Sequence, residues 1–276
     1  MNENSGAERN DGVFDIPIAF TEAELCERNG LLHLLLNNVH ALREGVMELD
    51  TRISRANAVE YYAARLYRID LNAQLTRDAI KDEDEGYAAF DLGSLLHTVC
   101  RLAEPFLARH GYILNWTHQV SPAIIVNGGP IGLRALILNA VLAAAQRVVP
   151  CSDSAVKVIL ERVKGGVSLE VYSYGPREQT VGGFTEDEVT RRVIEAVTKA
   201  HGGSVSFTDT ETGLEIKVMI PDASIIGFAR GGLKVKRLPT GTWDVAMQLS
   251  PLMDAADFDP EVMDDPWDGA EPDDED

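Results

Sequence analysis

The apolar side chains between Leu32 and Ile53 recur in steps of three and four residues. This is the a/d pattern of a helix that packs along its length against another helix. If Leu32 is an a position, His33 and His40 are both b positions, one heptad apart, and they lie beside the apolar seam rather than in it. A histidine there is in contact with water and free to react. The members of the seam are Leu32, Leu35, Val39, Leu42, Val46, Leu49 and Ile53.

A second and less apolar run repeats this spacing from Val59 to Ile80. The first run ends near residues 55–57, so a short connection there would join the two helices into a hairpin that ends at the charged segment 81–86. One hairpin cannot bury both seams well, whereas two hairpins from two copies of the chain can form a four-helix bundle. We therefore expect a homodimer. The members of the second seam are Val59, Tyr62, Leu66, Ile69, Ala73, Thr76 and Ile80.

The rest of the chain alternates between helical and strand patterns. Residues 90–111 have the helical period, Pro130 opens a very apolar helix that runs to residue 149, and residues 185–203 form a third helix with Thr185 as its cap. This order predicts an α+β fold in which helices cover one face of a mixed sheet. Strands are expected at 112–120, 123–128, 156–166, 167–175 and in a hairpin at 204–221, followed by a short strand within 227–239 and a short helix within 242–253.

The net charge of −19 is the strongest feature of the composition. Much of it lies in residues 254–276, which contain no Lys or Arg and are expected to be solvated and disordered. The acidic excess argues against nucleic acid as a partner, because phosphates would be repelled. No apolar run is long enough to span a membrane and no secretion signal is present, so a cytoplasmic protein is expected. Three widely spaced cysteines fit packing roles in a reducing compartment: Cys26, Cys100 and Cys151.

Five segments resemble the motifs of bacterial sensor histidine kinases. VHALREGV at 39–46 is similar to the phosphoacceptor box S-H-E-L-R-x-P-L, and ALILNAVLAAAQR at 135–147 is similar to the N-box helix. VSLEVYSYGP at 167–176 resembles the strand and loop of the G1 box, and VIEAVTKAHGGSVSF at 193–207 resembles the last helix and turn of the ATPase domain. FDLGSLLHTV at 90–99 resembles the segment that joins hairpin and ATPase domain.

The resemblance covers residues 32–221 and implies four parts. A flexible arm at 1–19 precedes a dimerisation and histidine-phosphotransfer hairpin at 20–84. A degenerate histidine-kinase-like ATPase domain, an α/β sandwich, follows at 85–237. A short helix and an acidic disordered tail form 238–276.

The positions that bind nucleotide in the family have changed. Ala143 replaces the N-box Asn that binds Mg²⁺, and Ser173 replaces the G1 Asp that binds adenine. Glu188 and Thr190 replace glycines that let backbone N–H groups approach the phosphates. Phosphoryl transfer from ATP depends on positioning and on metal-assisted neutralisation of charge. The resemblance therefore implies that the ATP and Mg²⁺ site is lost, that no cofactor is bound and that autokinase activity is absent.

The phosphoacceptor box keeps the family's histidine, leucine and arginine. His40 is the candidate phosphoacceptor, Arg43 can pair with a phosphoryl group or a partner's Asp, and Glu44 can orient the imidazole from one helical turn away. The family's acid after the histidine is Ala41 here, and its proline is Gly45. The alternative is that His40 is a solvated surface histidine. His33 is the second candidate, and His201, at a helix end, is expected to be structural.

Three hypotheses follow for function. The chain is a phosphotransfer protein whose His40 exchanges phosphate with the Asp of receiver domains, as in the degenerate kinase-like histidine phosphotransferases. Alternatively, it is a non-catalytic dimeric scaffold that binds a receiver or a kinase. The third hypothesis is an active histidine kinase with an atypical ATP site.

Overall fold

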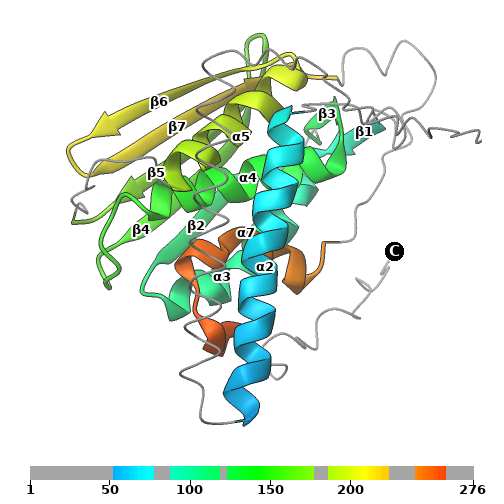
Figure 1. The fold of residues 1–276 in the computed structure, drawn as a ribbon. Coiled ribbons are helices and arrows are strands. Elements are labelled where there is room, and N and C mark those ends of the chain that lie inside the picture. The colour runs from blue at the N-terminus through cyan, green and yellow to red at the C-terminus, as the bar shows by residue number, and fades with distance from the viewer. Residues whose placement is uncertain (1–51, 78–87, 119–122, 177–185, 224–239, 259–276) are drawn as a thin grey trace, which may run out of the picture.

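The computed structural model describes residues 52–77, 88–118, 123–176, 186–223 and 240–258. A five-stranded sheet lies behind a layer of helices, and the long helix α2 crosses the front of that layer (Figure 1). The helices are α2 (Arg52–Arg77), α3 (Leu92–Arg109), α4 (Pro130–Ala145), α5 (Glu186–Ala200) and α7 (Thr242–Leu249), with 3-10 turns η1 (Ser250–Leu252) and η2 (Ala255–Phe258). The α+β class predicted from the sequence is confirmed.

The five strands are ordered β2-β4-β5-β7-β6 in the main sheet. β2 runs parallel to β4, and the other neighbours are antiparallel, so the sheet is mixed as predicted. Along β5, Val167, Leu169 and Val171 are buried against the helices, whereas the alternate residues Glu170 and Tyr172 are only half-buried. The strands are β2 (Ile113–His118), β4 (Ala155–Val163), β5 (Gly166–Tyr174), β6 (Ser204–Thr210) and β7 (Gly213–Ile220).

A small second sheet corrects one prediction. β1 (Ala88–Asp91) pairs antiparallel with β3 (Ile125–Gly128), so residues 88–91 are a strand and the helix predicted from residue 90 begins at Leu92. The boundary is set by Asp91, whose carboxylate accepts hydrogen bonds from the backbone N–H groups of Gly93 (3.0 Å) and Ser94 (3.3 Å). An N-cap of this kind satisfies donors that the first helical turn leaves free.

Helix α2 corrects a second prediction. It is continuous from Arg52 to Arg77, through residues 55–57, where the sequence had placed the connection of a hairpin. This stretch contains neither glycine nor proline, so nothing in it interrupts the helix. Ile53, counted as the last member of the first seam, therefore belongs to α2. The first seam otherwise lies outside the described residues.

The face of α2 that packs on the domain differs from the predicted seam. Ala58, Ala64, Arg68 and Asn72 are buried, and the neighbours of α2 are α5, α7 and the two 3-10 turns. Val59, a predicted seam member, is 52% exposed. One face of α2 thus belongs to the domain core, and the predicted seam is only partly buried there: its member Ile69 is 7% exposed.

The C-terminal segment also departs from expectation. The short helix predicted within 242–253 is present as α7 and η1, but the following residues are not a solvated tail. Asp257 is 1% exposed and Phe258 is 2% exposed. The aspartate lies against the cationic end of α3 and the phenylalanine lies against α2, so residues 254–258 are part of the fold. Among the described helices, none has both the length and the apolar content that a membrane crossing requires.

Candidate functional site

The positions that resemble the kinase nucleotide site lie on α4, β5 and α5, and α4 contacts both of the other elements. Ala143 is buried within α4 and offers only a methyl group. Ser173, near the end of β5, is 2% exposed, and its Oγ accepts a hydrogen bond from the backbone N–H of Leu214 at 2.9 Å. The hydroxyl is therefore used to join β5 to the start of β7.

The two α5 positions are also engaged inside the protein. Glu188 forms an ion pair with Arg192, one turn along the same helix, at 3.1 Å. Thr190 is fully buried, and its Oγ1 accepts a hydrogen bond from Nη2 of Arg68 at 2.8 Å. A backbone that cradles phosphate needs accessible N–H groups and small residues. Here a carboxylate and a buried threonine occupy those positions.

Five buried polar side chains meet between α2, α4, α5 and α7, and we call this set the polar junction: Arg68, Asn72, Asn139, Thr190 and Gln248. Asn139, the remaining N-box asparagine, is at its centre and is 0% exposed. Its Nδ2 donates to the carbonyl of Ala135 at 2.8 Å and to Oε1 of Gln248 at 3.1 Å. Its Oδ1 lies 3.4 Å from Nη2 of Arg68 and 3.5 Å from Nδ2 of Asn72. Gln248 Nε2 also donates to Asn72 Oδ1, at 3.5 Å.

The polar junction determines what α4 can bind. Every residue of α4 except Ile131 is buried, and the amide of Asn139 is already bonded on both its nitrogen and its oxygen. Buried polar groups that are bonded to other protein groups stay in place. Breaking such a bond would leave the group away from water and without a partner, which costs free energy. The face of the N-box-like helix is thus occupied by side chains of α2 and α7.

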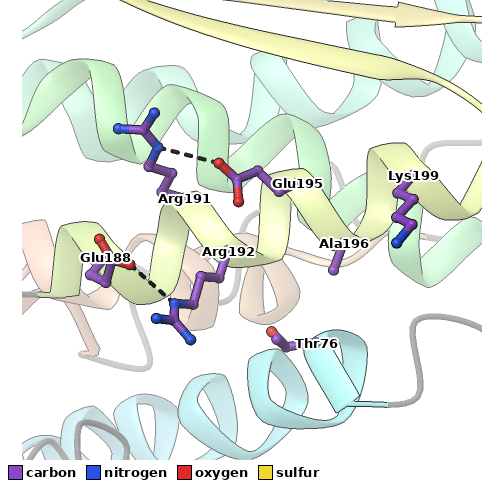
Figure 2. A pocket seen from close by; sticks show the side chains of 7 residues that line it. All are labelled: Thr76, Glu188, Arg191, Arg192, Glu195, Ala196 and Lys199. Carbon is purple, nitrogen blue, oxygen red and sulfur yellow. Dashed lines mark hydrogen bonds and ion pairs between the residues drawn. The ribbon is translucent and has the colours of Figure 1, made fainter. Parts of the chain in front are cut away.

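A groove of about 560 Å³ lies between the end of α2 and the outer face of α5 (Figure 2). Arg191, Arg192 and Lys199 supply positive charge, and the first two are paired with Glu195 (3.3 Å) and Glu188 (3.1 Å). Exposed pairs of this kind are weak and can exchange partners. The groove presents side chains of both charges; its lining is Thr76, Glu188, Arg191, Arg192, Glu195, Ala196 and Lys199.

The perturbed titratable groups lie away from the polar junction. Hydrogen bonds from Lys217 and Tyr172 lower the pKa of the Glu170 carboxyl on the open face of the sheet. The same contact with Glu170 raises the pKa of the Tyr172 hydroxyl. Burial raises the pKa of the Cys100 thiol to about 12, so this cysteine stays protonated and inert, in agreement with the packing role predicted for it.

The predicted phosphotransfer residues lie outside the described part of the chain: His33, His40, Arg43 and Glu44. They remain predictions. His201 is described, and it is structural as expected: it is buried, its Nδ1 lies 2.7 Å from the carbonyl oxygen of Val197, and its ring packs directly against Gly128. Among the described residues, no group of three or more His, Cys, Asp or Glu side chains could hold a metal ion.

Sequence reasoning missed Arg68, Asn72 and Gln248. Arg68 and Asn72 are four residues apart and so share one face of α2, but an isolated Arg and Asn on a helix usually indicate a solvated face. Gln248 lies in a short apolar helix near the C-terminus. The available signal was that the face shared by Arg68 and Asn72 also carries Ala58 and Ala64, which let another element approach closely.

No protein-family model matches the sequence, and no curated protein sequence matches it. Several solved structures match at low identity. The histidine kinase AdeS of Acinetobacter baumannii has 15% identity and a TM-score of 0.49, covering 71% of this chain and 97% of that chain. The cytoplasmic segment of histidine kinase QseC has 20% identity and a TM-score of 0.45, covering 58% of this chain and 95% of that chain. Histidine kinase ThkA, in complex with the response regulator TrrA, has 15% identity and a TM-score of 0.48, covering 73% of this chain and 61% of that chain. At these identities the likeness concerns the fold.

Proposed function

We propose that this chain is a two-component signalling protein that is built like a histidine kinase core but does not take phosphate from ATP. The observation that carries the proposal is the polar junction. The N-box-like asparagine Asn139 is enclosed by Arg68, Asn72 and Gln248. This enclosure supports the proposal, because an amide that is bonded on both its nitrogen and its oxygen has no free group to offer a nucleotide. Ala143 supplies no metal ligand beside it.

His40 carries the chemistry in this proposal, as a relay with receiver domains. A neutral imidazole nitrogen attacks the phosphorus of the acyl phosphate on a receiver's Asp. The new N–P bond forms as the O–P bond breaks, and the electron pair leaves on the Asp carboxylate. The receiver's own Mg²⁺ neutralises the phosphoryl oxygens, so this chain needs no metal or nucleotide site. The reverse reaction returns the phosphoryl group to a receiver.

The neighbours of His40 have supporting roles in the proposal. Arg43 pairs with the phosphoryl group or with the receiver's acidic residues, and Glu44 orients the imidazole from one helical turn away. A homodimer through the hairpin would bury the a/d seam of residues 32–53. The partners would be receiver domains, or a kinase that supplies phosphate, in the cytoplasm.

Phosphotransfer assays test this proposal directly. The parent, His40→Gln and His33→Gln proteins are each mixed with a panel of receiver domains phosphorylated on their Asp, and label on this chain is followed with time. We expect label on the parent and on His33→Gln, and none on His40→Gln. A parallel incubation with Mg-ATP labelled on its γ-phosphate should leave all three proteins unlabelled.

Other outcomes assign the alternatives. Label from Mg-ATP on the parent would mean an active kinase with an atypical site. Receiver binding without label on the parent, or equal label on the His40→Gln protein, would reject the relay through His40. Binding without transfer would make the dimeric scaffold the better assignment.

A further inference from the structure

We propose that residues 242–258, which we call the C-terminal clamp, hold helix α2 onto the domain and keep the polar junction closed. The clamp consists of α7, η1 and η2. The proposal concerns how the two ends of the described chain are coupled, and it stands whether or not His40 carries a phosphoryl group.

The clamp contacts α2 at three levels along the helix. In the first half of α2, the centroid of the Tyr61 ring lies 5.7 Å from the centroid of the Phe258 ring. Farther along, Trp243 packs edge-on against Tyr67 with ring centroids 5.6 Å apart. Deeper in the interface, Gln248 Nε2 donates to Asn72 Oδ1 at 3.5 Å. These contacts lie between residues 61 and 72, in the middle part of α2.

The other side of the clamp is anchored on α3 and α4. The Asp257 carboxylate pairs with Arg109 Nη1 at 3.0 Å and lies 2.6 Å from His110 Nε2 at the end of α3. The Asp244 carboxylate pairs with Arg134 Nη1 of α4 at 2.7 Å. The Asp257 carboxylate is 1% exposed, so water cannot replace its partners on α3. Separating this ion pair would leave a buried charge without a partner, and the pair therefore holds η2 against α3.

Apart from the clamp, α2 is held by α5 and α4. Arg68 donates to Thr190 of α5 at 2.8 Å and lies 3.4 Å from Asn139 of α4, and Ile69 is buried beside Val189 of α5. The other buried residues of this face of α2 are small or polar. Elements attached in this way are the ones that open locally while the rest of a domain stays folded.

Hydrogen exchange on the full chain tests the clamp. Phe258→Ala removes the ring that touches α2, and Asp257→Asn weakens the anchor on α3. Both variants should raise the exchange rate of amides in residues 52–77 at least tenfold, while amides of β4, β5 and β7 keep the parental rate. Val218→Ala, a core change in β7 far from the clamp, is the matched control and should raise exchange in the sheet.

Two results would overturn the proposal. One is a parental exchange rate in residues 52–77 for both clamp variants. The other is an increase in α2 that only matches an equal increase in the sheet, as global destabilisation would produce. If Phe258→Ala does not fold, Phe258→Leu keeps an apolar side chain without the ring contact and is judged by the same two criteria.

Discussion

Ser173 stands where the kinase family has its adenine-binding aspartate, and here its hydroxyl serves the sheet. The hydroxyl is buried and accepts from the backbone N–H of Leu214. Thr190 and Asn139 show the same change of use, since each is fully buried and bonded to Arg68. Buried polar side chains of this kind are held by protein partners.

Replacing Ser173 with alanine should lower the stability of the folded protein. The Leu214 N–H would lose its partner in a buried place, which costs about 1–3 kcal/mol. Urea unfolding should show a lower midpoint with an unchanged slope. Ser206→Ala, at an exposed position of β6, is the control and should leave the midpoint within about 0.5 kcal/mol of the parent. Equal midpoints for the two variants would contradict the structural role of Ser173.

At the scale of single residues, the sequence did not reveal the long-range contacts. The motif comparison identified Ala143, Ser173, Glu188 and Thr190 as altered positions, and His201 as structural. It could not find Arg68 as the partner of Thr190, or Gln248 as the partner of Asn139 and Asn72. The Asn72–Gln248 contact joins residues 176 positions apart, and no local period or spacing reports such a pair.

At the scale of elements, the open face of the sheet carries a charged pair between neighbouring strands. Glu170 on β5 lies directly opposite Lys217 on β7, and Lys217 Nζ donates to Glu170 Oε1 at 2.5 Å. Ser168 and Tyr172, on the same face of β5, donate to the same carboxylate. Cross-strand pairs of this kind help to fix the register of the two strands.

This pair should make stability depend on pH in a defined window. Hydrogen bonds from Lys217 and Tyr172 lower the folded-state pKa of Glu170 below its ordinary 4.5. The stabilisation from Glu170 is therefore complete above pH 4.5, the ordinary pKa, and is lost as the pH falls through the lower pKa of the folded state. Glu170→Gln should cost about 0.2–1 kcal/mol at neutral pH, since the pair is partly exposed, and nothing in strong acid.

The measurement is chemical unfolding of the parent and Glu170→Gln over a series of pH values. Glu211→Gln, at an exposed carboxylate in the turn between β6 and β7, is the matched control. A difference between parent and Glu170→Gln that stays constant, or grows as pH falls, would contradict the assignment.

Elements were predicted well where periodicity was strong and poorly at their ends. The alternation in β4, β5 and β7 and the helical periods of α3 and α5 were read correctly, because one face of each is buried. The errors lie at boundaries. Residues 55–57 contain no glycine or proline that would break a helix. The apolar period weakens there and therefore predicts a turn at these residues, which is wrong. β1 was missed because its four residues are too short to show alternation.

At the scale of the whole molecule, two truncations should behave differently. A chain that ends after Phe258 loses ten acidic residues and no described contact, so its melting temperature should match that of the parent. A chain that ends after Met253 also loses Asp257 and Phe258. The loss of a buried aromatic ring and of a buried carboxylate with cationic partners should cost roughly 3–5 kcal/mol.

Differential scanning calorimetry checks both truncations. Equal melting temperatures for the two truncated chains would show that η2 adds nothing to the fold. A lowered melting temperature for the longer chain would show that residues 259–276 also stabilise the folded state.

The global architecture followed from the order of predicted elements, but the placement of α2 and of the C-terminus did not. A run of acidic residues usually indicates a solvated tail. For this reason the sequence did not show that residues 254–258 pack against the domain. Asp254 and Asp257 look like members of that run. Only the arrangement in space shows that Asp257 faces Arg109 and His110, residues brought together from 147 or more positions away.

The meeting of α2 with the clamp has a consequence for how the protein is made. A ribosome releases α2 early and the clamp last among the described elements, and the sheet with its covering helices can assemble in between. Until residues 242–258 have left the exit tunnel, Asn72 and Asn139 lack their partner Gln248. The polar junction therefore closes after the sheet has formed, and a polypeptide that stops before the clamp leaves both amides without that partner.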